Sequence, residues 1–139
     1  RRSTKDRRGH VALNLAIDVN RYVDYCRDDP EAAAVIDRAR RIAVPFVVLA
    51  EVRAGFHHGT KLRQNEKDLA RFLQTPRVEV LFADEATTHL YAAIYAELRA
   101  AATPIPTNDI WIAALVIQHD LVLFSRDRHF ECVPRLARV

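Results

Sequence analysis

Two carboxylates in this sequence come shortly after apolar runs of the kind that form buried strands. Asp18 ends the run at 10–17, and Asp127 follows the run at 121–124. The carboxyl ends of parallel strands lie at one edge of a sheet, so these two side chains are expected at the same edge. An acidic residue in that place is exposed enough to bind a cation.

Two further acids lie within apolar helical patterns. Asp109 falls in the first turn of the helix predicted to run through residue 117, where the helix dipole favours its anionic form. Glu51 is surrounded by apolar residues inside another helical run, a setting that a surface glutamate rarely needs. The alternative, in which Asp109 only caps its helix and Asp127 only makes a turn, stays open.

Four acids brought together by one sheet would repel one another, and this repulsion would raise the pKa of at least one of them. A bound Mg²⁺ or Mn²⁺ removes that cost, because both ions prefer hard oxygen ligands. A metal site made of carboxylates alone is typical of phosphodiester chemistry. The spacing therefore predicts a metal-dependent enzyme that acts on nucleic acid.

Several polar residues next to these acids are candidates for supporting roles. Asn20 and Ser125 can orient metal-bound waters or a phosphate, with ordinary capping and turn formation as the alternative. Arg21 and Arg126 can hold the phosphates of a nucleic acid, with ion pairing on the surface as the alternative. His129 is expected to be a turn residue beside a buried Phe130.

The composition fits one folded domain. The chain has 139 residues, of which 50% are apolar and only three are glycine, so a core can form without disulfides. Cys26 and Cys132 are expected to be reduced thiols. The apolar runs are too short to span a bilayer, which predicts a cytoplasmic protein with no membrane partner.

The net charge of +3 belongs to the N-terminus. Residues 1–8 contain five basic residues and one acidic residue, and the remaining chain contains 16 basic and 17 acidic residues. Residues 1–9 are therefore predicted to be a basic, flexible leader, and residues 10–139 a single domain. The leader either contacts nucleic acid or is simply solvated.

Strands and helices are predicted to alternate along the chain. Strands are expected at 10–17, 42–45, 78–82 and 121–124, with a short last one near 135–138. Helices are expected at 19–27, 31–41, 46–56, 62–73 and 85–101, with Asp84 as the N-cap of the fifth, and a last one is carried by Ile110 to Ile117 with Asp109 in its first turn. Alternation at these lengths predicts an α/β fold in which helices cover both faces of a parallel sheet.

The segments IDVN, LAEVRAGF and IPTNDIWIAALVIQHDLVLFSRDRHF resemble the PIN domain, specifically the VapC-type toxins of prokaryotic toxin–antitoxin pairs. The resemblance covers residues 11–137. It implies a three-layer α/β/α fold with a central parallel sheet of four to five strands, Mg²⁺ or Mn²⁺ dependence, and endonucleolytic cleavage of RNA. It also implies a cognate antitoxin bound to a toxin homodimer. The four acids of that family correspond to Asp18, Glu51, Asp109 and Asp127, as catalytic residues and metal ligands.

Two positions depart from the pattern of that family. Val19 stands where a small hydroxyl residue is usual, which removes a possible hydrogen bond near the metal and is expected to lower activity. Ser125 stands where threonine is commoner and keeps the hydroxyl.

Two other functions are compatible with the same residues. A PIN-like module that binds RNA or protein without efficient catalysis would agree with Val19. A metal-dependent phosphatase with an aspartyl nucleophile would ordinarily have a second aspartate two residues after the first, where this chain has Asn20.

Overall fold

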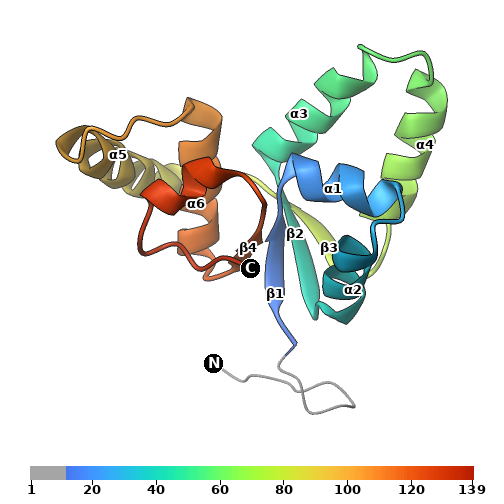
Figure 1. Ribbon diagram of the computed structural model, residues 1–139, viewed down its shortest axis with the longest axis horizontal. Helices are drawn as coiled ribbons and strands as arrows, with labels where there is room; N and C mark the ends of the chain where they lie inside the picture. The colour runs from blue at the N-terminus through green and yellow to red at the C-terminus, as the bar shows by residue number, and fades with distance from the viewer. Residues whose placement is uncertain (1–11) are drawn as a thin grey trace.

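The structure is a computed structural model that describes residues 12–139, so the leader predicted at 1–9 lies outside the described residues. Its centre is a parallel sheet of four strands, β1 (Asn14–Ile17), β2 (Arg41–Pro45), β3 (Val78–Leu81) and β4 (Val122–Phe124). The strand order is β3-β2-β1-β4 (Figure 1). Leu15 in β1 pairs with Ile42 on one side and Val122 on the other.

The connections between the strands determine which helices cover which face. The chain moves from β1 to β3 through α1 (Val19–Cys26), α2 (Pro30–Arg38), α3 (Phe46–Phe56) and α4 (Leu62–Leu73). It then returns across the sheet to β4 through α5 (Glu85–Ala100) and α6 (Thr107–Gln118). Crossovers between parallel strands are right-handed, so opposite directions of travel put helices on opposite faces. Accordingly, α5 and α6 lie to the left of the strands in Figure 1 and α1–α4 to the right.

The core lies on both faces of β1 and around α6. Leu15, Ala16 and Ile17 are fully buried, which explains why this strand is a continuous apolar run instead of an alternating one. In α6, the residues 112–116 are all buried, including Ala113 and Ala114, whose small side chains allow close packing. The amino end of α6 is therefore held firmly beside the sheet.

The predicted elements are present, with changes at their ends. The helix expected at 31–41 ends at Arg38, because the chain enters β2 at Arg41. Asp84 caps α5 as expected, and its side chain accepts from Thr87 in a capping box. The short strand expected near 135–138 is a single bridge between Leu123 and Arg138 in the described chain. β4 has only three residues, so it offers few backbone groups with which a fifth strand could pair.

No helix among residues 12–139 combines the length and apolar character that a membrane span requires.

Candidate metal centre

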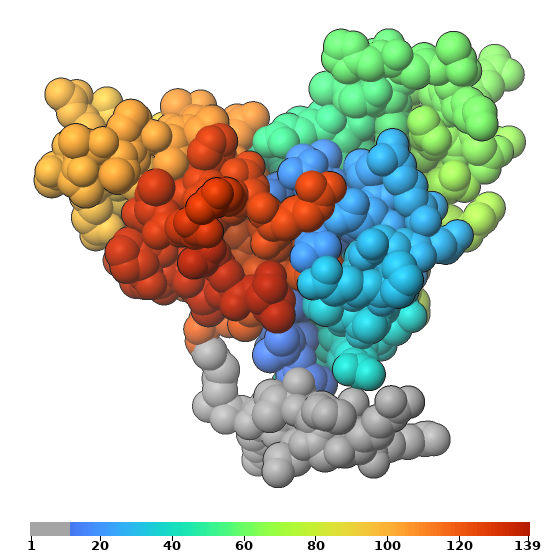
Figure 2. Space-filling model, in the orientation of Figure 1, coloured from blue at the N-terminus to red at the C-terminus, as the bar shows by residue number. Residues whose placement is uncertain are grey.

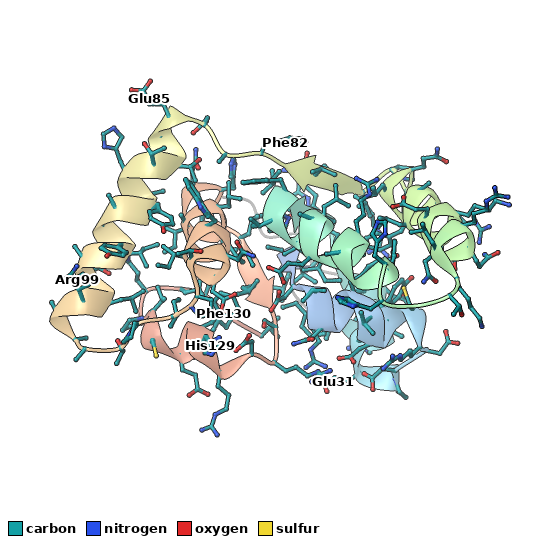
Figure 3. The ribbon with its side chains drawn as sticks, turned by 90° about the horizontal axis from the view of Figure 1, so that it is seen from above. Glu31, Phe82, Glu85, Arg99, His129 and Phe130 are labelled. Carbon is teal, nitrogen blue, oxygen red and sulfur yellow. The ribbon has the colours of Figure 1, made fainter. Side chains whose placement is uncertain are left out.

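The four acids predicted from the sequence come from four separate segments that meet at the carboxyl edge of the sheet. Asp18 lies between β1 and α1, and Asp127 precedes the 3₁₀-helix η1 (Arg128–Cys132) after β4. Asp109 lies in the first turn of α6, and Glu51 lies in the middle of α3. The chain runs upward through β1 in Figure 1, so Figure 3 looks down onto this edge. In Figure 2 the upper surface is hollowed between the lobe of α5 and α6 and the lobe of α3 and α4.

Asp18 is the most buried of these acids, and two donors fix its carboxylate. Asp18 as a whole residue is only 3% exposed. The backbone N–H of Val19 donates to Asp18 Oδ1 at 2.8 Å, and Ser125 Oγ donates to Asp18 Oδ2 at 2.7 Å. Ser125 Oγ also accepts from the backbone N–H of Asp127 at 3.0 Å. Ser125 therefore links the first and last acids, and it supplies a hydroxyl to Asp18 although position 19 has none. Its predicted role in orienting metal-bound waters or a phosphate stays a prediction.

Asp109 and Asp127 are connected through His129. His129 Nδ1 lies 2.9 Å from Asp109 Oδ2 and 3.2 Å from Asp127 Oδ1. Asp127 Oδ1 also accepts from the backbone N–H of His129 at 2.9 Å. One ligand atom from each of these three residues lies within 4.8 Å of the others, a spacing that can hold a metal ion. His129 is thus more than the turn residue expected, whereas the neighbouring Phe130 is fully buried as expected.

Glu51 joins the other acids through Asn108, a residue that the sequence did not single out. Asn108 Nδ2 donates to Glu51 Oε1 at 3.2 Å, which connects α3 to the first turn of α6. The sequence feature that could have identified Asn108 as a site residue is its position directly before Asp109, in the first turn of α6. Likewise, the signal for His129 was its place two residues after Asp127.

The acids are close enough to raise one another's pKa values. Burial raises the pKa of Asp18, and the charge of Asp127 adds to it, against the hydrogen bonds from Ser125 and Val19. Burial also raises the pKa of Glu51, as do the charges of Asp18, Asp109 and Asp127, in that order. The pKa of Asp109 is raised by burial and then by Asp127 and Asp18, against its contact with His129. Negative charge is therefore costly at this edge without a cation.

This cost predicts how the stability of the metal-free protein depends on pH. An unfolded Asp109 ionises near its ordinary pKa of 3.8, and the folded one at a higher pH. Between these two values the folded protein holds more protons, so its free energy of unfolding falls as pH rises, and the loss is complete above the folded pKa. Melting temperatures of the parent and of Asp109→Asn, measured in EDTA between about pH 4 and 7, should therefore diverge in favour of the variant. Carboxyls such as Asp84 titrate in both proteins and cancel in the difference. A difference that stays constant with pH would contradict this electrostatic cost.

The structure pairs the two candidate phosphate-binding arginines with Asp24 instead of with the four acids. Arg21 contacts Asp24 and Glu31, and Arg126 contacts Asp24 with two nitrogens. Asn20 lies half-buried in the first turn of α1. Binding of RNA by Arg21, Arg126 or Asn20 stays a prediction.

The donors at this edge fit a divalent cation. Asp109 and Asp127 offer the hard oxygen atoms that Mg²⁺ and Mn²⁺ prefer, and His129 places a ring nitrogen within 4.8 Å of both. Asp18 and Glu51 are not part of this close group, but their charges act on it from nearby. A cation would also relieve the repulsion that raises the pKa values of Asp18, Glu51 and Asp109. Both the chemistry and the charge of the site therefore suit such an ion.

The sequence profile of the PIN domain matches residues 15–136, nearly the whole described chain. The chain belongs to the PIN domain family, whose profile spans all four acids. Ribonuclease VapC4 of Mycobacterium tuberculosis is 31% identical over 91 residues, which are 66% of this chain and 70% of that protein. Ribonuclease VapC2 of Rickettsia felis is 28% identical over 119 residues, which are 85% of each chain.

Solved structures share the same fold. VapBC2 of Rickettsia felis, bound to a DNA fragment from its promoter, has a TM-score of 0.78 at 24% identity, covering 91% of this chain and 98% of the other. VapBC-1 of nontypeable Haemophilus influenzae has a TM-score of 0.80 at 21% identity, covering 91% of this chain and 97% of the other. The α/β/α architecture expected from the sequence is thus confirmed.

Proposed function

We propose that this protein is a Mg²⁺- or Mn²⁺-dependent endoribonuclease and the toxin of a toxin–antitoxin pair. The observation that carries the proposal is the convergence of Asp18, Glu51, Asp109 and Asp127 at one sheet edge, where burial and then neighbouring charge raise the pKa values of three of them. The relatives named as ribonucleases and the related VapBC structures support both the reaction and the antitoxin partner.

Each acid has a distinct place in this reaction. The family resemblance favours Asp18 and Asp109 as the direct ligands of the ion, and hydrogen-bonding contacts with Ser125 and His129 hold their carboxylates in place. Glu51 and Asp127 complete the site directly or through water. The ion would polarise the scissile phosphate and lower the pKa of a bound water, the two effects that phosphodiester hydrolysis needs.

Glu51 is the best placed of the four to move a proton. It is half-buried, and Asn108 Nδ2 orients one of its oxygens. Burial, the largest cause and one that a bound cation does not remove, raises its pKa above the ordinary value of 4.5, which brings it closer to the pH at which proton transfer is efficient. Glu51 can therefore accept a proton from the attacking water.

The same site offers an inhibitory contact for an antitoxin. A pocket between α1, α3 and α4 is lined by Val23, Val52 and Phe56 and also by Glu51. An apolar partner segment in this pocket would bring its own arginine within reach of the acids, where charge-assisted hydrogen bonds form readily. As a toxin of this type, the protein would act in the cytoplasm as a homodimer.

RNA cleavage by the purified protein tests the proposed reaction. Hydrolysis by water should leave a 5′-phosphate and a 3′-hydroxyl, which mapping of the RNA ends would reveal. Ends with a 2′,3′-cyclic phosphate would overturn the mechanism, because they require attack by the ribose hydroxyl. Binding of Mn²⁺ and RNA without cleavage would support the alternative of a binding module. Phosphate release from small monoesters without RNA cleavage would support the phosphatase alternative.

A further inference from the structure

The segment after β4 is attached to α1 outside the acidic centre as well as inside it. Arg126 lies between Ser125 and Asp127, but its side chain reaches Asp24 near the end of α1. Arg126 Nε donates to Asp24 Oδ2 at 3.0 Å, and Arg126 Nη2 donates to Asp24 Oδ1 at 3.1 Å. This two-point geometry holds a guanidinium and a carboxylate in one relative orientation.

A second arginine holds Asp24 from the interior. Arg21 is only 8% exposed, and its Nη1 lies 3.4 Å from Asp24 Oδ2 while its Nη2 lies 3.3 Å from Glu31 Oε1. Its guanidinium also lies 4.4 Å from the ring centre of Phe124, the last residue of β4. The three residues Arg21, Asp24 and Arg126 form what we call the arginine bracket.

The bracket gives the segment after β4 a second point of attachment. The inner attachment is the hydrogen bond from Ser125 to Asp18, and the outer one is the pair of Arg126 with Asp24. Asp18 and Asp24 are six positions apart, so the two attachments are separated by roughly 9 Å along α1. One attachment would let the segment pivot, whereas two separated attachments fix its orientation, and with it the direction of Asp127.

We propose that the arginine bracket positions Asp127 for metal binding, an inference that rests on the metal-dependent function proposed above. The bracket residues touch neither the ion nor the substrate in this proposal, so they are positioning residues. Asp127 must lie beside both Asp109 and Ser125, and the bracket fixes the short segment that carries it.

The charges of the bracket argue against a direct role in holding RNA. Asp24 and Glu31 offset the charges of Arg21 and Arg126, and Arg21 is too buried to meet a phosphate. A contribution to stability alone is also a weak explanation for the outer pair. The Arg126 side chain is 55% exposed, and ion pairs at such exposure contribute little to the free energy of unfolding.

Electrostatics and positioning can be separated with two variants, because they predict opposite changes in cation affinity for one of them. Asp24→Ala removes a negative charge near the site, so charge alone would weaken binding of a cation. Arg126→Ala removes a positive charge, so charge alone would strengthen it. Loss of positioning would weaken binding in both variants. The double variant keeps the net charge of the parent, so only positioning predicts that it binds as weakly as the single variants.

The experiment titrates each full-length variant with Mn²⁺ and measures free Mn²⁺ by electron paramagnetic resonance. We expect each single variant and the double variant to lose about tenfold in affinity, the low end for outer partners of metal ligands. Arg126→Lys, which keeps the charge but not the two-point geometry, should also bind less tightly than the parent. Glu97→Gln breaks an exposed ion pair with Arg135 on another part of the surface and should bind Mn²⁺ as the parent does.

Unchanged or tighter Mn²⁺ binding by Arg126→Ala or Arg126→Lys would overturn the proposal that the bracket positions Asp127. A higher KM for RNA in Arg126→Ala, with Mn²⁺ affinity intact, would show instead that Arg126 holds phosphate. Melting curves establish that each variant is folded, and Arg126→Lys carries the test if an alanine variant is not. Absence of Mn²⁺ binding by the parent would count against the proposed function itself.

Discussion

Asp109→Asn should reduce RNA cleavage at least about a hundredfold, equivalent to roughly 2.7 kcal/mol of the activation barrier. The change keeps the shape of the side chain and leaves an oxygen that can accept from His129, so the fold should persist. It removes the charge that makes Asp109 a candidate metal ligand, and it also removes one of the neighbouring charges that raise the pKa of Glu51. Addition of Mn²⁺ should therefore raise the melting temperature of the parent much more than that of the variant.

Glu85→Gln is the matched control for this variant. Glu85 is also an acid in the first turn of a helix, α5, but it lies away from the acidic centre: Figure 3 shows it at the upper left, far from His129. Cleavage by Glu85→Gln should equal that of the parent. If Asp109→Asn cleaved RNA at the parent rate, Asp109 would have no place in the catalytic site.

Removal of divalent cations should abolish cleavage altogether. Four carboxylates at one edge repel the phosphates of RNA, so the loss should affect binding of the substrate as well as the chemical step. Excess Mg²⁺ or Mn²⁺ should restore activity after EDTA treatment.

Melting curves measure the binding of the divalent cation without RNA. An ion that binds only the folded protein stabilises it by about 2.7 kcal/mol at a hundred times its dissociation constant. The melting temperature should therefore rise with Mn²⁺ concentration and return to its starting value in EDTA. Cleavage that persists in EDTA would exclude a metal-dependent reaction.

The order of strands and helices could be predicted because the chain is locally consistent. The apolar run before Asp18 is buried on both faces, and the apolar helix after Asp109 is the central helix of the fold. Element ends were harder to predict, because they depend on neighbours. Helix α2 stops at Arg38 only because Arg41 already pairs with Asn14 in β1. A strand near 138 would need a longer β4 than the three residues present.

Asp18, Asp109 and Asp127 were predicted from their places at the ends of strands and the start of a helix, and Glu51 from its apolar helical surroundings. The contacts around these acids could not be predicted. Asn108 reaches Glu51 across 57 positions of sequence, and Arg126 reaches Asp24 across 102. Sequence adjacency places Arg126 beside Asp127 but does not show that its side chain points away to another helix. Such contacts depend on how α1, α3 and α6 pack, which no local pattern records.

The place of β4 in the chain determines when, during synthesis, the acidic centre can form. β4 is the last strand to be made, and it pairs with β1, the first. Asp18 and Glu51 leave the ribosome long before Ser125 and Asp127, so Asp18 lacks its hydroxyl donor for most of translation. A growing chain therefore carries an incomplete centre while it is still close to the messenger and the ribosomal RNA. For a ribonuclease, an acidic centre that is completed only by β4 would stay incomplete until most of the domain has been made.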